Sequence, residues 1–261
     1  MCGRFVSARK RLELLEEFAV ERDSVPADRD PEHADYNVAP TKRIYAVLDH
    51  KDKDEPGKPQ RELRLVRWGL VPSWAKDVSV GARMINARAE TVAVKPSFRS
   101  AFKRRRCLIP ADGYYEWQAA EAGKKAPKQP FYIYRSDGGI LAFAGIYELW
   151  RDASLPDDHE HAWLWTASII TTEATDEIGK IHDRTPMVVP TDGWADWLDP
   201  TNNDKDLLLA TMRPAPISGA DGLTSHPVST AVNSVRNNGP DLVVSVGDAT
   251  PGISQPETGG T

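Results

Sequence analysis

Residues 107–117 read CLIPADGYYEW and bring two short apolar or aromatic segments, CLIP and GYYEW, close together in the chain. Similar segments follow at 130–135 (PFYIYR), 139–150 (GILAFAGIYELW) and 162–171 (AWLWTASIIT). Short runs of this composition predict β-strands. Helical segments lie among them without a regular strand–helix–strand rhythm, so the sequence predicts a single α+β domain.

A hairpin is predicted upstream of these strands. Residues 43–48 (RIYAVL) and 61–71 (RELRLVRWGLV) flank a charged turn at 50–60 (HKDKDEPGKPQ). Positions 61–67 alternate polar residues with Leu or Val, so one face of this strand is expected to be buried.

Helices are predicted both before and after the strand-rich region. Residues 8–20 carry an apolar stripe with Ser7 as the N-cap, and another helix is expected to start at residues 96–98. Three helices with acidic caps and a last strand-like piece are expected near residues 171–181, 191–198, 202–212 and 225–235.

Length and composition limit the class of protein. The chain has 261 residues, of which 40% are hydrophobic and 27% charged, as in an ordinary globular protein. It shows neither an apolar run long enough for a membrane helix nor a secretory signal. We therefore expect a cytoplasmic protein with no membrane contact, a single domain over residues 1–245 and a disordered tail over 246–261.

Cysteine and metal motifs exclude further classes. Cys2 and Cys107 are the two cysteines, too few for a disulfide framework or a four-cysteine zinc site. The sequence has no glycine-rich phosphate loop, HExxH or CxxC, so no metal and no cofactor are expected. Cys107 precedes Leu-Ile-Pro and is expected to be a buried thiol on a strand.

A basic segment is hidden by the net charge of −5. Residues 81–107 contain eight Lys or Arg residues and one Glu, a net charge of +7. A local basic surface attracts a polyanion even on an acidic protein, because salt screens the more distant charges. The alternative is a solvated helix face without a partner.

Cys2 is a candidate nucleophile. Removal of Met1 would turn Cys2 into a 1,2-aminothiol, whose amine and thiol both have nucleophilic fractions at neutral pH. The amine condenses with an aldehyde to an imine, and the thiol then closes a five-membered thiazolidine ring. This pairing makes an aldehyde the natural electrophile. The alternative is an ordinary buried or frayed cysteine.

Three other side chains are candidates for proton transfer or for binding a sugar phosphate. Glu116 lies among aromatic residues, which favour a raised carboxyl pKa, and His182 can carry a proton near neutral pH. Asn86 lies in the basic segment, where an amide suits phosphate and sugar oxygens. A structural role is the alternative for each of them.

Two tryptophans are candidates for base stacking. Trp68 and Trp74 lie in the segment WGLVPSW at 68–74. Aromatic rings stack on bases of any sequence in single strands. Packing in the core is the alternative.

Seven segments, in order, resemble the motifs of the SRAP (SOS response-associated peptidase) family, proteins that process abasic sites and crosslink to DNA. They lie at residues 1–5 (MCGRF), 36–40 (YNVAP), 68–69 (WG), 85–91 (INARAET), 115–117 (YEW), 181–187 (IHDRTPM) and 225–229 (SHPVS). The resemblance covers residue 1 to about residue 240.

The resemblance implies a reaction and its catalytic residues. Mature Cys2 would trap the ring-opened aldehyde of an abasic site in single-stranded DNA as a stable thiazolidine. Asn86 would orient the opened sugar, Glu116 would shuttle protons, and His182 would act in ring opening and in reversal of the adduct. The family is also credited with removing its own Met1 and with strand cleavage through the imine, which is lyase chemistry.

The resemblance also implies a DNA-binding surface on an α+β fold with a β-barrel-like core. The residues concerned are Arg4, Arg88 and Arg184 for phosphates, Asn37 and Pro40 for the shape of the site, and Trp68 and Trp74 for the bases. The partner would be single-stranded DNA with an abasic site, bound by a monomer that associates with the nucleoid.

Two other functions stay open from the residues. A cysteine-type intracellular peptidase would use Cys2 as a thiolate paired with a histidine, and its amine would be irrelevant. A non-catalytic single-strand-binding protein would use the basic segment and the tryptophans, with no role for Cys2. Substitution of Cys2 separates the three functions by loss of crosslinking, loss of peptide turnover or no effect.

Overall fold

Strands dominate the computed structural model of this chain. The structure describes residues 2–28, 30, 34–50, 59–119, 127–159, 161–174, 176–215 and 222–247. The strands are β1 (Phe5–Ser7), β2 (Arg22–Asp23), β3 (Asp35–Val38), β4 (Arg43–His50), β5 (Gln60–Trp68), β6 (Asn86–Arg88), β7 (Arg106–Ala111), β8 (Gly113–Gln118), β9 (Gln129–Arg135), β10 (Leu141–Arg151), β11 (Trp163–Glu173), β12 (Arg184–Val188), β13 (Arg213–Pro214) and β14 (Leu223–Pro227). The α-helices are α1 (Arg11–Glu17), α2 (Ala89–Val92), α3 (Arg99–Arg104), α4 (Asp176–Gly179), α5 (Trp194–Leu198) and α6 (Lys205–Thr211), with 3₁₀ turns η1 (Val78–Arg83), η2 (Thr191–Gly193), η3 (Thr230–Asn233) and η4 (Pro240–Val243).

A ring of five strands forms the centre of the larger sheet. β7 pairs with β4, β4 with β5, β5 with β11, β11 with β10, and β10 again with β7. The β4–β5 and β10–β11 pairings are long and antiparallel, whereas β5 and β11 pair in parallel over two residues. The ring is therefore a partly closed barrel, and the predicted α+β class with a β-barrel-like core is confirmed.

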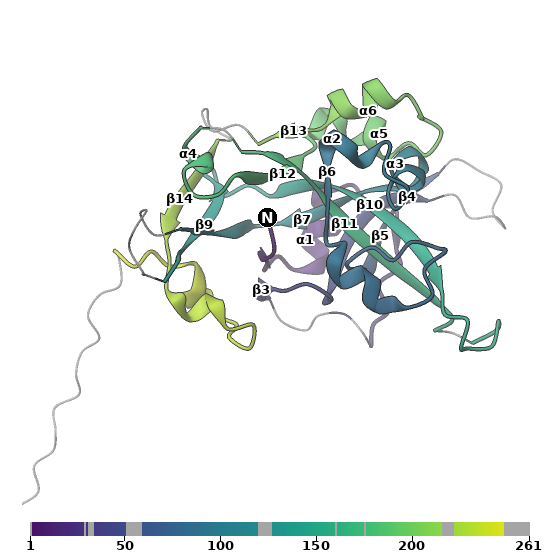
Figure 1. The fold of residues 1–261 in the computed structure, drawn as a ribbon, viewed down its shortest axis with the longest axis horizontal. Helices are drawn as coiled ribbons and strands as arrows, with labels where there is room; N and C mark the ends of the chain where they lie inside the picture. Colours follow the sequence, from purple (N-terminus) through teal and green to yellow (C-terminus); the bar gives the residue numbers. More distant parts are fainter. Residues whose placement is uncertain are drawn as a thin grey trace, which may run out of the picture.

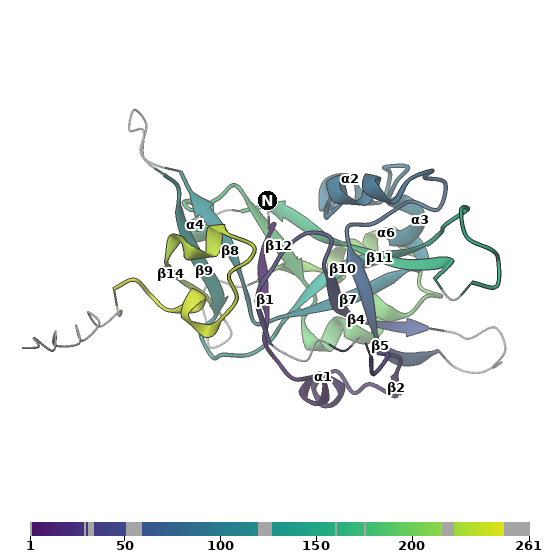
Figure 2. The same cartoon turned by 90° about the horizontal axis from the view of Figure 1, so that it is seen from below.

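A second sheet, in the order β14–β9–β8–β1–β3, lies beside this ring. Figure 1 shows β9, β14 and α4 at one end of the molecule, and α2, α3, α5 and α6 at the other. Figure 2 shows β1 between the two halves. The first strand of the chain is thus an interior strand, with β3 on one side and β8 on the other.

The alternation of side chains along the ring strands divides the core into two clusters. On β4, Ala46 belongs to a cluster that also contains Cys2 and Phe5. Its neighbour Val47 belongs to the cluster that contains Phe18 and other residues packed around the helices. A shift of one residue in strand register would exchange the two faces, so the register is strongly specified.

The first helix begins later than the sequence suggests. Residue 7 is the last residue of β1, and α1 begins at Arg11 with Lys10 in the N-cap position and no side-chain cap. The expected N-cap role of Ser7 is therefore wrong, because the chain stays extended to pair with β3 and β8. Likewise, α3 begins at Arg99 with Phe98 before it.

The later helices form near the predicted places, but their caps differ. Asp204 caps α6 as expected, accepting hydrogen bonds from the N–H groups of Asp206 and Leu207. α5 follows Gly193 and has no side-chain cap, so the expected acidic cap is wrong there. Cys107 is buried on β7, as predicted.

Two predicted segments fall wholly or partly outside the described residues. β4 and β5 form the predicted hairpin, and residues 51–58 of its turn are not described. Near the other end, Val246 donates from its N–H to the carbonyl of Pro227 (3.0 Å), and the predicted tail lies outside the description from residue 248 onward. Of the helices that the structure describes, none has the length and apolar character to cross a membrane.

One cation of the basic segment is internal. Arg106 on β7 is 2% exposed, and its guanidinium donates hydrogen bonds to five backbone carbonyl oxygens. The acceptors belong to Phe102 (3.0 Å), Lys103 (2.7 Å), Trp197 (2.6 Å), Asn202 (3.0 Å) and Asp199. Arg106 therefore ties β7 to α3 and to the chain around α5, and it is not part of a surface for polyanions.

We expect Arg106→Met to lower the free energy of unfolding by about 3–5 kcal/mol, because five carbonyl groups lose a buried, charged donor. Urea unfolding followed by tryptophan fluorescence measures this change. Arg104→Met removes the same charge from an exposed position on α3 and should change the free energy by less than about 0.5 kcal/mol. Equal effects of the two substitutions would contradict the structural role of Arg106.

Candidate active site

Cys2 lies immediately before β1, in the interior of the protein. The strand that follows it is paired on both sides, with Phe5 opposite Val38 of β3 and opposite Tyr114 of β8. Cys2 itself is fully buried. The position of its sulfur is therefore set by the sheet and not by a flexible chain end.

The surroundings of Cys2 keep its thiol protonated. Burial raises the pKa of the Cys2 thiol well above its ordinary value, and the charge of Glu116 raises it further. A hydrogen bond from the backbone N–H of Arg4 acts in the opposite direction and favours the thiolate. Any reaction of this sulfur therefore needs a neighbour that accepts its proton.

β6 brings Asn86 to the main chain of Cys2. β6 runs parallel to β11, with Asn86 opposite Ile169. Nδ2 of Asn86 donates a hydrogen bond to the carbonyl of Cys2 (2.8 Å), and its Oδ1 is buried without a hydrogen-bond partner among the described residues. Asn86 thus holds Cys2 with one end of its amide and keeps an acceptor available at the other.

Glu116 is a carboxylic acid whose pKa lies near neutrality. It lies on β8 and is 1% exposed. Burial raises the pKa of Glu116 to about 7, and the charge of the chain's amino terminus is the main influence in the opposite direction. At neutral pH both the acid and the carboxylate are populated, as a group that gives and takes protons requires.

His182 faces Glu116 from the segment before β12. Its Nε2 lies 3.8 Å from Oε2 of Glu116. Its Nδ1 accepts a hydrogen bond from the N–H of Arg184 (3.0 Å), so the proton of the neutral ring is on Nε2, on the side of Glu116. Burial lowers the pKa of His182, which favours this neutral form. On protonation, the ring can instead pair with Asp183, whose Oδ1 lies 2.9 Å from Nδ1.

A buried hydrogen bond joins β8, which carries Glu116, to β12, which begins two residues after His182. The hydroxyl groups of Tyr114 on β8 and Thr185 on β12 lie 3.0 Å apart. Tyr114 and Glu116 are two residues apart on one strand and therefore share a face. This spacing in GYYEW could have pointed to Tyr114 as part of the site. Thr185 carried no signal in the sequence, because its partner is distant in the chain.

The structure thus brings Cys2, Asn86, Glu116 and His182 together from four separate segments. The contacts that join them are the Asn86–Cys2 hydrogen bond, the His182–Glu116 approach and the electrostatic influence of Glu116 on the thiol. Within the described ranges, no three His, Cys, Asp or Glu side chains are placed to hold a metal ion.

Two of the residues expected to contact DNA make internal contacts. Arg4 donates from Nη1 to Oδ1 of Asn37 (2.7 Å) and to the carbonyl of Val232 (2.8 Å). Asn37 is fully buried, and its Nδ2 donates to the carbonyls of Ser234 (2.9 Å) and Asn237 (3.0 Å). Together they tie the N-terminal strands to the chain around η3.

Arg88 and Arg184 differ in what they bind. Arg184 donates to both carboxylate oxygens of Glu90 (2.9 and 3.2 Å) and to the carbonyl of Thr171 (2.6 Å). Arg88 is exposed and forms no side-chain hydrogen bond or ion pair with the residues described. Arg88 can therefore take a phosphate directly, whereas Arg184 must first exchange Glu90 for it.

The two tryptophans have opposite exposures. Trp68 is fully buried, its Nε1 donates to the carbonyl of Ile85 (3.0 Å), and its ring meets that of Phe5 at 5.2 Å. The core covers the ring of Trp68, and its stacking on a base stays a prediction. Trp74 is 65% exposed and keeps a surface for stacking. Pro40 is half-buried in the loop between β3 and β4.

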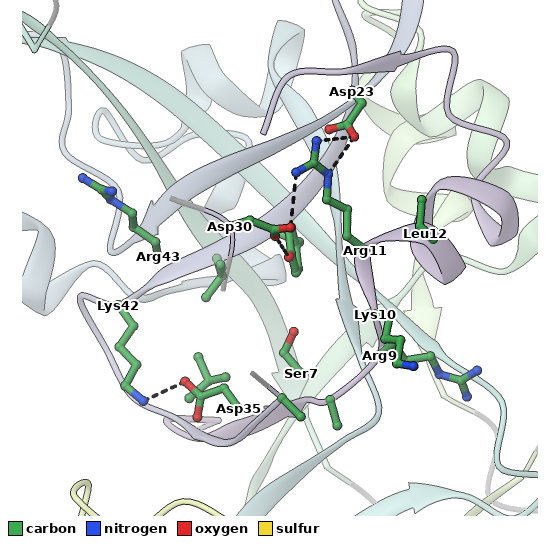
Figure 3. A pocket seen from close by; sticks show the side chains of 15 residues that line it. Ser7, Arg9, Lys10, Arg11, Leu12, Asp23, Asp30, Asp35, Lys42 and Arg43 are labelled. Carbon is green, nitrogen blue, oxygen red and sulfur yellow. Dashed lines mark hydrogen bonds and ion pairs between the residues drawn. The ribbon is translucent and has the colours of Figure 1, made fainter. Parts of the chain in front are cut away.

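A pocket of about 630 Å³ lies elsewhere, among β1, α1, β3 and β4 (Figure 3). Several of its charged side chains pair with one another, Arg11 with Asp23 and Asp30, and Lys42 with Asp35. None of the four converging residues lines it. The pocket is therefore not the candidate active site.

A protein-family model matches most of this chain. The family model described as SOS response associated peptidase (SRAP) matches residues 1–235. This chain therefore belongs to the SRAP family, and the resemblance seen in the sequence is confirmed.

Individual relatives match over most of the chain. This chain is 37% identical over 245 residues to the abasic site processing protein YoqW of Bacillus subtilis (strain 168). The match covers 94% of this chain and 100% of YoqW. The chain is 32% identical to YedK of Escherichia coli (strain K12), covering 93% and 99%, and 32% identical to HMCES of Gallus gallus, covering 81% and 66%. A crystal structure of a protein from Bacteroides thetaiotaomicron has a TM-score of 0.74 at 24% identity, covering 94% of this chain and 99% of that one, so the two share a fold.

We expect the wild-type protein to lose stability relative to Glu116→Gln as the pH rises from about 4.5 to about 7. An unfolded glutamate ionises at the lower end of this range and folded Glu116 at the upper end, so the folded state binds more protons in between. The gain in free energy of unfolding from Glu116→Gln should therefore grow by up to about 3 kcal/mol across the range. Urea unfolding at several pH values measures it.

Glu13→Gln is the matched control, because Glu13 is exposed on α1. Its effect on the free energy of unfolding should not change with pH over this range. An effect of Glu116→Gln that is equally flat would contradict the raised pKa of Glu116.

Proposed function

We propose that this protein captures the aldehyde of an abasic site in single-stranded DNA through Cys2 and thereby shields the lesion. One observation carries the proposal: a cysteine at residue two is built into the core beside a carboxylic acid whose pKa is about 7. The names of YoqW, YedK and HMCES, all abasic site processing proteins, support the same substrate for this chain.

The capture proceeds in two bond-forming steps. The free α-amine of mature Cys2 adds to the aldehyde carbon of the opened sugar, and the resulting carbinolamine loses water to give an imine. The thiol then adds to the carbon of the protonated imine; its proton passes to the carboxylate of Glu116, and the nitrogen keeps its own proton. The product is a five-membered thiazolidine that contains both the sulfur and the nitrogen of Cys2.

Glu116 and His182 serve the proton transfers. Protonated Glu116 delivers a proton to the leaving hydroxyl of the carbinolamine, and its carboxylate then accepts the proton of the thiol. His182, once protonated to the imidazolium, can return the proton on Nε2 to Glu116 or assist opening of the sugar ring. Asn86 offers its free Oδ1 to a hydroxyl group of the opened sugar.

Met1 must be removed before this chemistry can start, because an amide nitrogen does not form an imine. The family description as a peptidase supports hydrolysis of the Met1–Cys2 bond by the protein itself. Strand cleavage through the imine is the lyase reaction expected when the thiol does not close the ring. Both activities belong to the same proposed site.

The buried thiol argues against the other two functions. A peptidase that acts on other proteins uses a cysteine held as a thiolate, but the surroundings of Cys2 raise the pKa of its thiol and keep it protonated. Binding of single strands alone does not require a buried cysteine at residue 2 or a nearby carboxyl group with a raised pKa. Both remain distinguishable outcomes of the experiment below.

We expect Cys2→Ser to abolish the stable adduct with a single-stranded oligonucleotide that contains one abasic site. The amine survives, so borohydride should still trap the imine, but a hydroxyl group closes the ring far less favourably than a thiol. Strand cleavage should rise, because the imine is no longer captured. Denaturing gel electrophoresis with and without borohydride measures all three products.

Cys107→Ala is the matched control, since it removes the other thiol from the interior of β7 and should leave the adduct unchanged. An N-terminal tag that cannot be removed should abolish both the adduct and the trapped imine. A heat-stable crosslink that Cys2→Ser forms without reductant would refute the thiazolidine.

Non-covalent binding should depend on salt despite the acidic net charge. With roughly 4–6 phosphates in contact, the slope of log K against log salt should be about −3 to −4. Arg88→Ala should make this slope shallower by about 0.7 for any DNA sequence, because phosphate contacts carry no base information. Fluorescence anisotropy in a Cys2→Ala background measures it, and Arg43→Ala, exposed beside the pocket of Figure 3, should leave the slope unchanged.

A further inference from the structure

A second pocket lies between α3 and α6, outside the site formed around Cys2. It has a volume of about 550 Å³. Its lining consists of Ala93, Arg99, Ser100, Phe102, Lys103, Asn203, Lys205 and Leu208. Three of these side chains are cationic and two are neutral hydrogen-bonding groups, and the lining contains no carboxylate.

The positive charge of this pocket is not compensated by neighbours. Arg99 and Lys103 are four residues apart on α3, so they lie on one face, and a like-charged pair at this spacing repels. Together with Lys205 they form no ion pair within the described part of the chain. Asp204 and Asp206 flank Lys205 in the sequence. Asp204 uses its side chain to cap α6, and Asp206 forms no ion pair with these three cations in the described part of the chain. The pocket therefore presents an open cationic surface.

The pocket is joined to the candidate active site by one short piece of chain. β6 carries Asn86 at its start and the exposed Arg88 at its end, and α2 begins at the next residue. α2 ends at Val92, and Ala93 lines the pocket. At about 1.5 Å per residue, the helix covers roughly 6–8 Å between Arg88 and the pocket. Figures 1 and 2 show α2 and α3 side by side, with α2 on the side of the N-terminus.

We propose that the pocket between α3 and α6 binds the phosphate backbone of the DNA strand on one side of the captured lesion. This inference rests on the proposed function and extends it: Arg88 holds a phosphate at the mouth of the site, and Arg99, Lys103 and Lys205 hold phosphates further along. Ser100 and Asn203 add neutral donors for phosphate oxygens. The strand leaves the site over α2 and is held on this side in a fixed direction.

Phosphate diester fits the observations better than other anions. A buried or enclosed site for a free phosphate would need donors that converge on one point, whereas these cations are spread over two helices. Arg88, which precedes the short helix α2 that leads to the pocket, adds a further exposed cation between the pocket and Asn86 along the chain. A flexible chain of evenly spaced single negative charges can contact several such cations at once.

The test is the binding of oligonucleotides with flanks of different length to the double variant Lys103→Ala/Lys205→Ala. Each oligonucleotide carries one abasic site near its centre or near one end, with a flank of about ten nucleotides on the 5′ side, the 3′ side or both. Dissociation constants are measured by fluorescence anisotropy over a range of salt concentrations. All variants carry Cys2→Ala, so the measurement does not depend on adduct formation.

We expect one of the two flanks to strengthen binding in a way that the double variant loses. For that flank, the double variant should bind roughly 5- to 10-fold more weakly, with a salt slope shallower by about 1.4, from about 0.7 per phosphate. For the opposite flank, the two proteins should bind equally. Alanine suits a helix, so neither substitution should disturb α3 or α6, and circular dichroism verifies this.

Lys10→Ala/Arg43→Ala is the matched control, because it removes two exposed cations from the pocket beside α1 that Figure 3 shows. It should leave binding of both flanks unchanged. If binding weakens equally for both flanks, or equally in the control, the effect comes from the loss of positive charge in general and not from this pocket. Either result would overturn the proposal. Wild-type binding of inorganic phosphate that the double variant loses, without any flank dependence, would also overturn it in favour of a small-anion site.

The outcome is separate from that of the proposed function. If Cys2 forms no adduct but the flank dependence is seen, the capture chemistry fails and the pocket stands. If the adduct forms and neither flank matters, the capture chemistry stands and the pocket fails.

Discussion

The insertion of β1 between β3 and β8 is the constraint on which the site depends. Chain ends usually fray, because few contacts hold them. Here the ring of Phe5 meets those of Trp68 (5.2 Å) and Phe143 (6.1 Å), and the strand is paired along both edges. A reactive group at residue two can be held in one place only if the strand behind it is anchored in this way. The same anchoring removes Trp68 from the surface and the Cys2 thiol from water.

The burial of Glu116 raises its pKa and lowers the stability of the folded protein near neutral pH. A carboxyl group on the surface would be fully ionised at neutral pH and would cost nothing to the fold. Buried on β8 beside Cys2, Glu116 resists ionisation, and folding is penalised above the pH at which an unfolded glutamate loses its proton. The hydrogen bond between Tyr114 and Thr185 offsets part of such costs by holding β8 against β12. Buried ionisable groups with shifted pKa values are typical of sites that carry out proton transfer.

Local patterns in the sequence predicted the elements well, and they could not predict the partners of charged and aromatic side chains. The alternation over residues 61–67 marked β5, and the apolar runs from residue 107 onward marked the strands of the ring. The sequence made both Trp68 and Trp74 candidates for base stacking, although Trp68 is fully buried and Trp74 is 65% exposed. Arg106 and Arg184 looked like free cations, but their partners Trp197 and Glu90 lie 91 and 94 residues away in the chain. Such pairings follow from the tertiary fold. The chemistry of Cys2, Asn86, Glu116 and His182 made them candidates and the SRAP resemblance grouped them, whereas the contacts among them come from the structure.

The contact between Arg4 and Val232 has a consequence for synthesis of the chain. The two residues are separated by 228 positions, and the first strand also waits for β8 before it can pair on both sides. At about 5–20 residues per second, a ribosome needs roughly 10–50 s to produce the segment that closes this contact. During that interval Cys2 is on a nascent chain that lacks the completed sheet and the contact between Arg4 and Val232. The candidate site is therefore completed only when translation of the folded body is nearly finished, and a truncated product ending before η3 would carry Cys2 without the completed site.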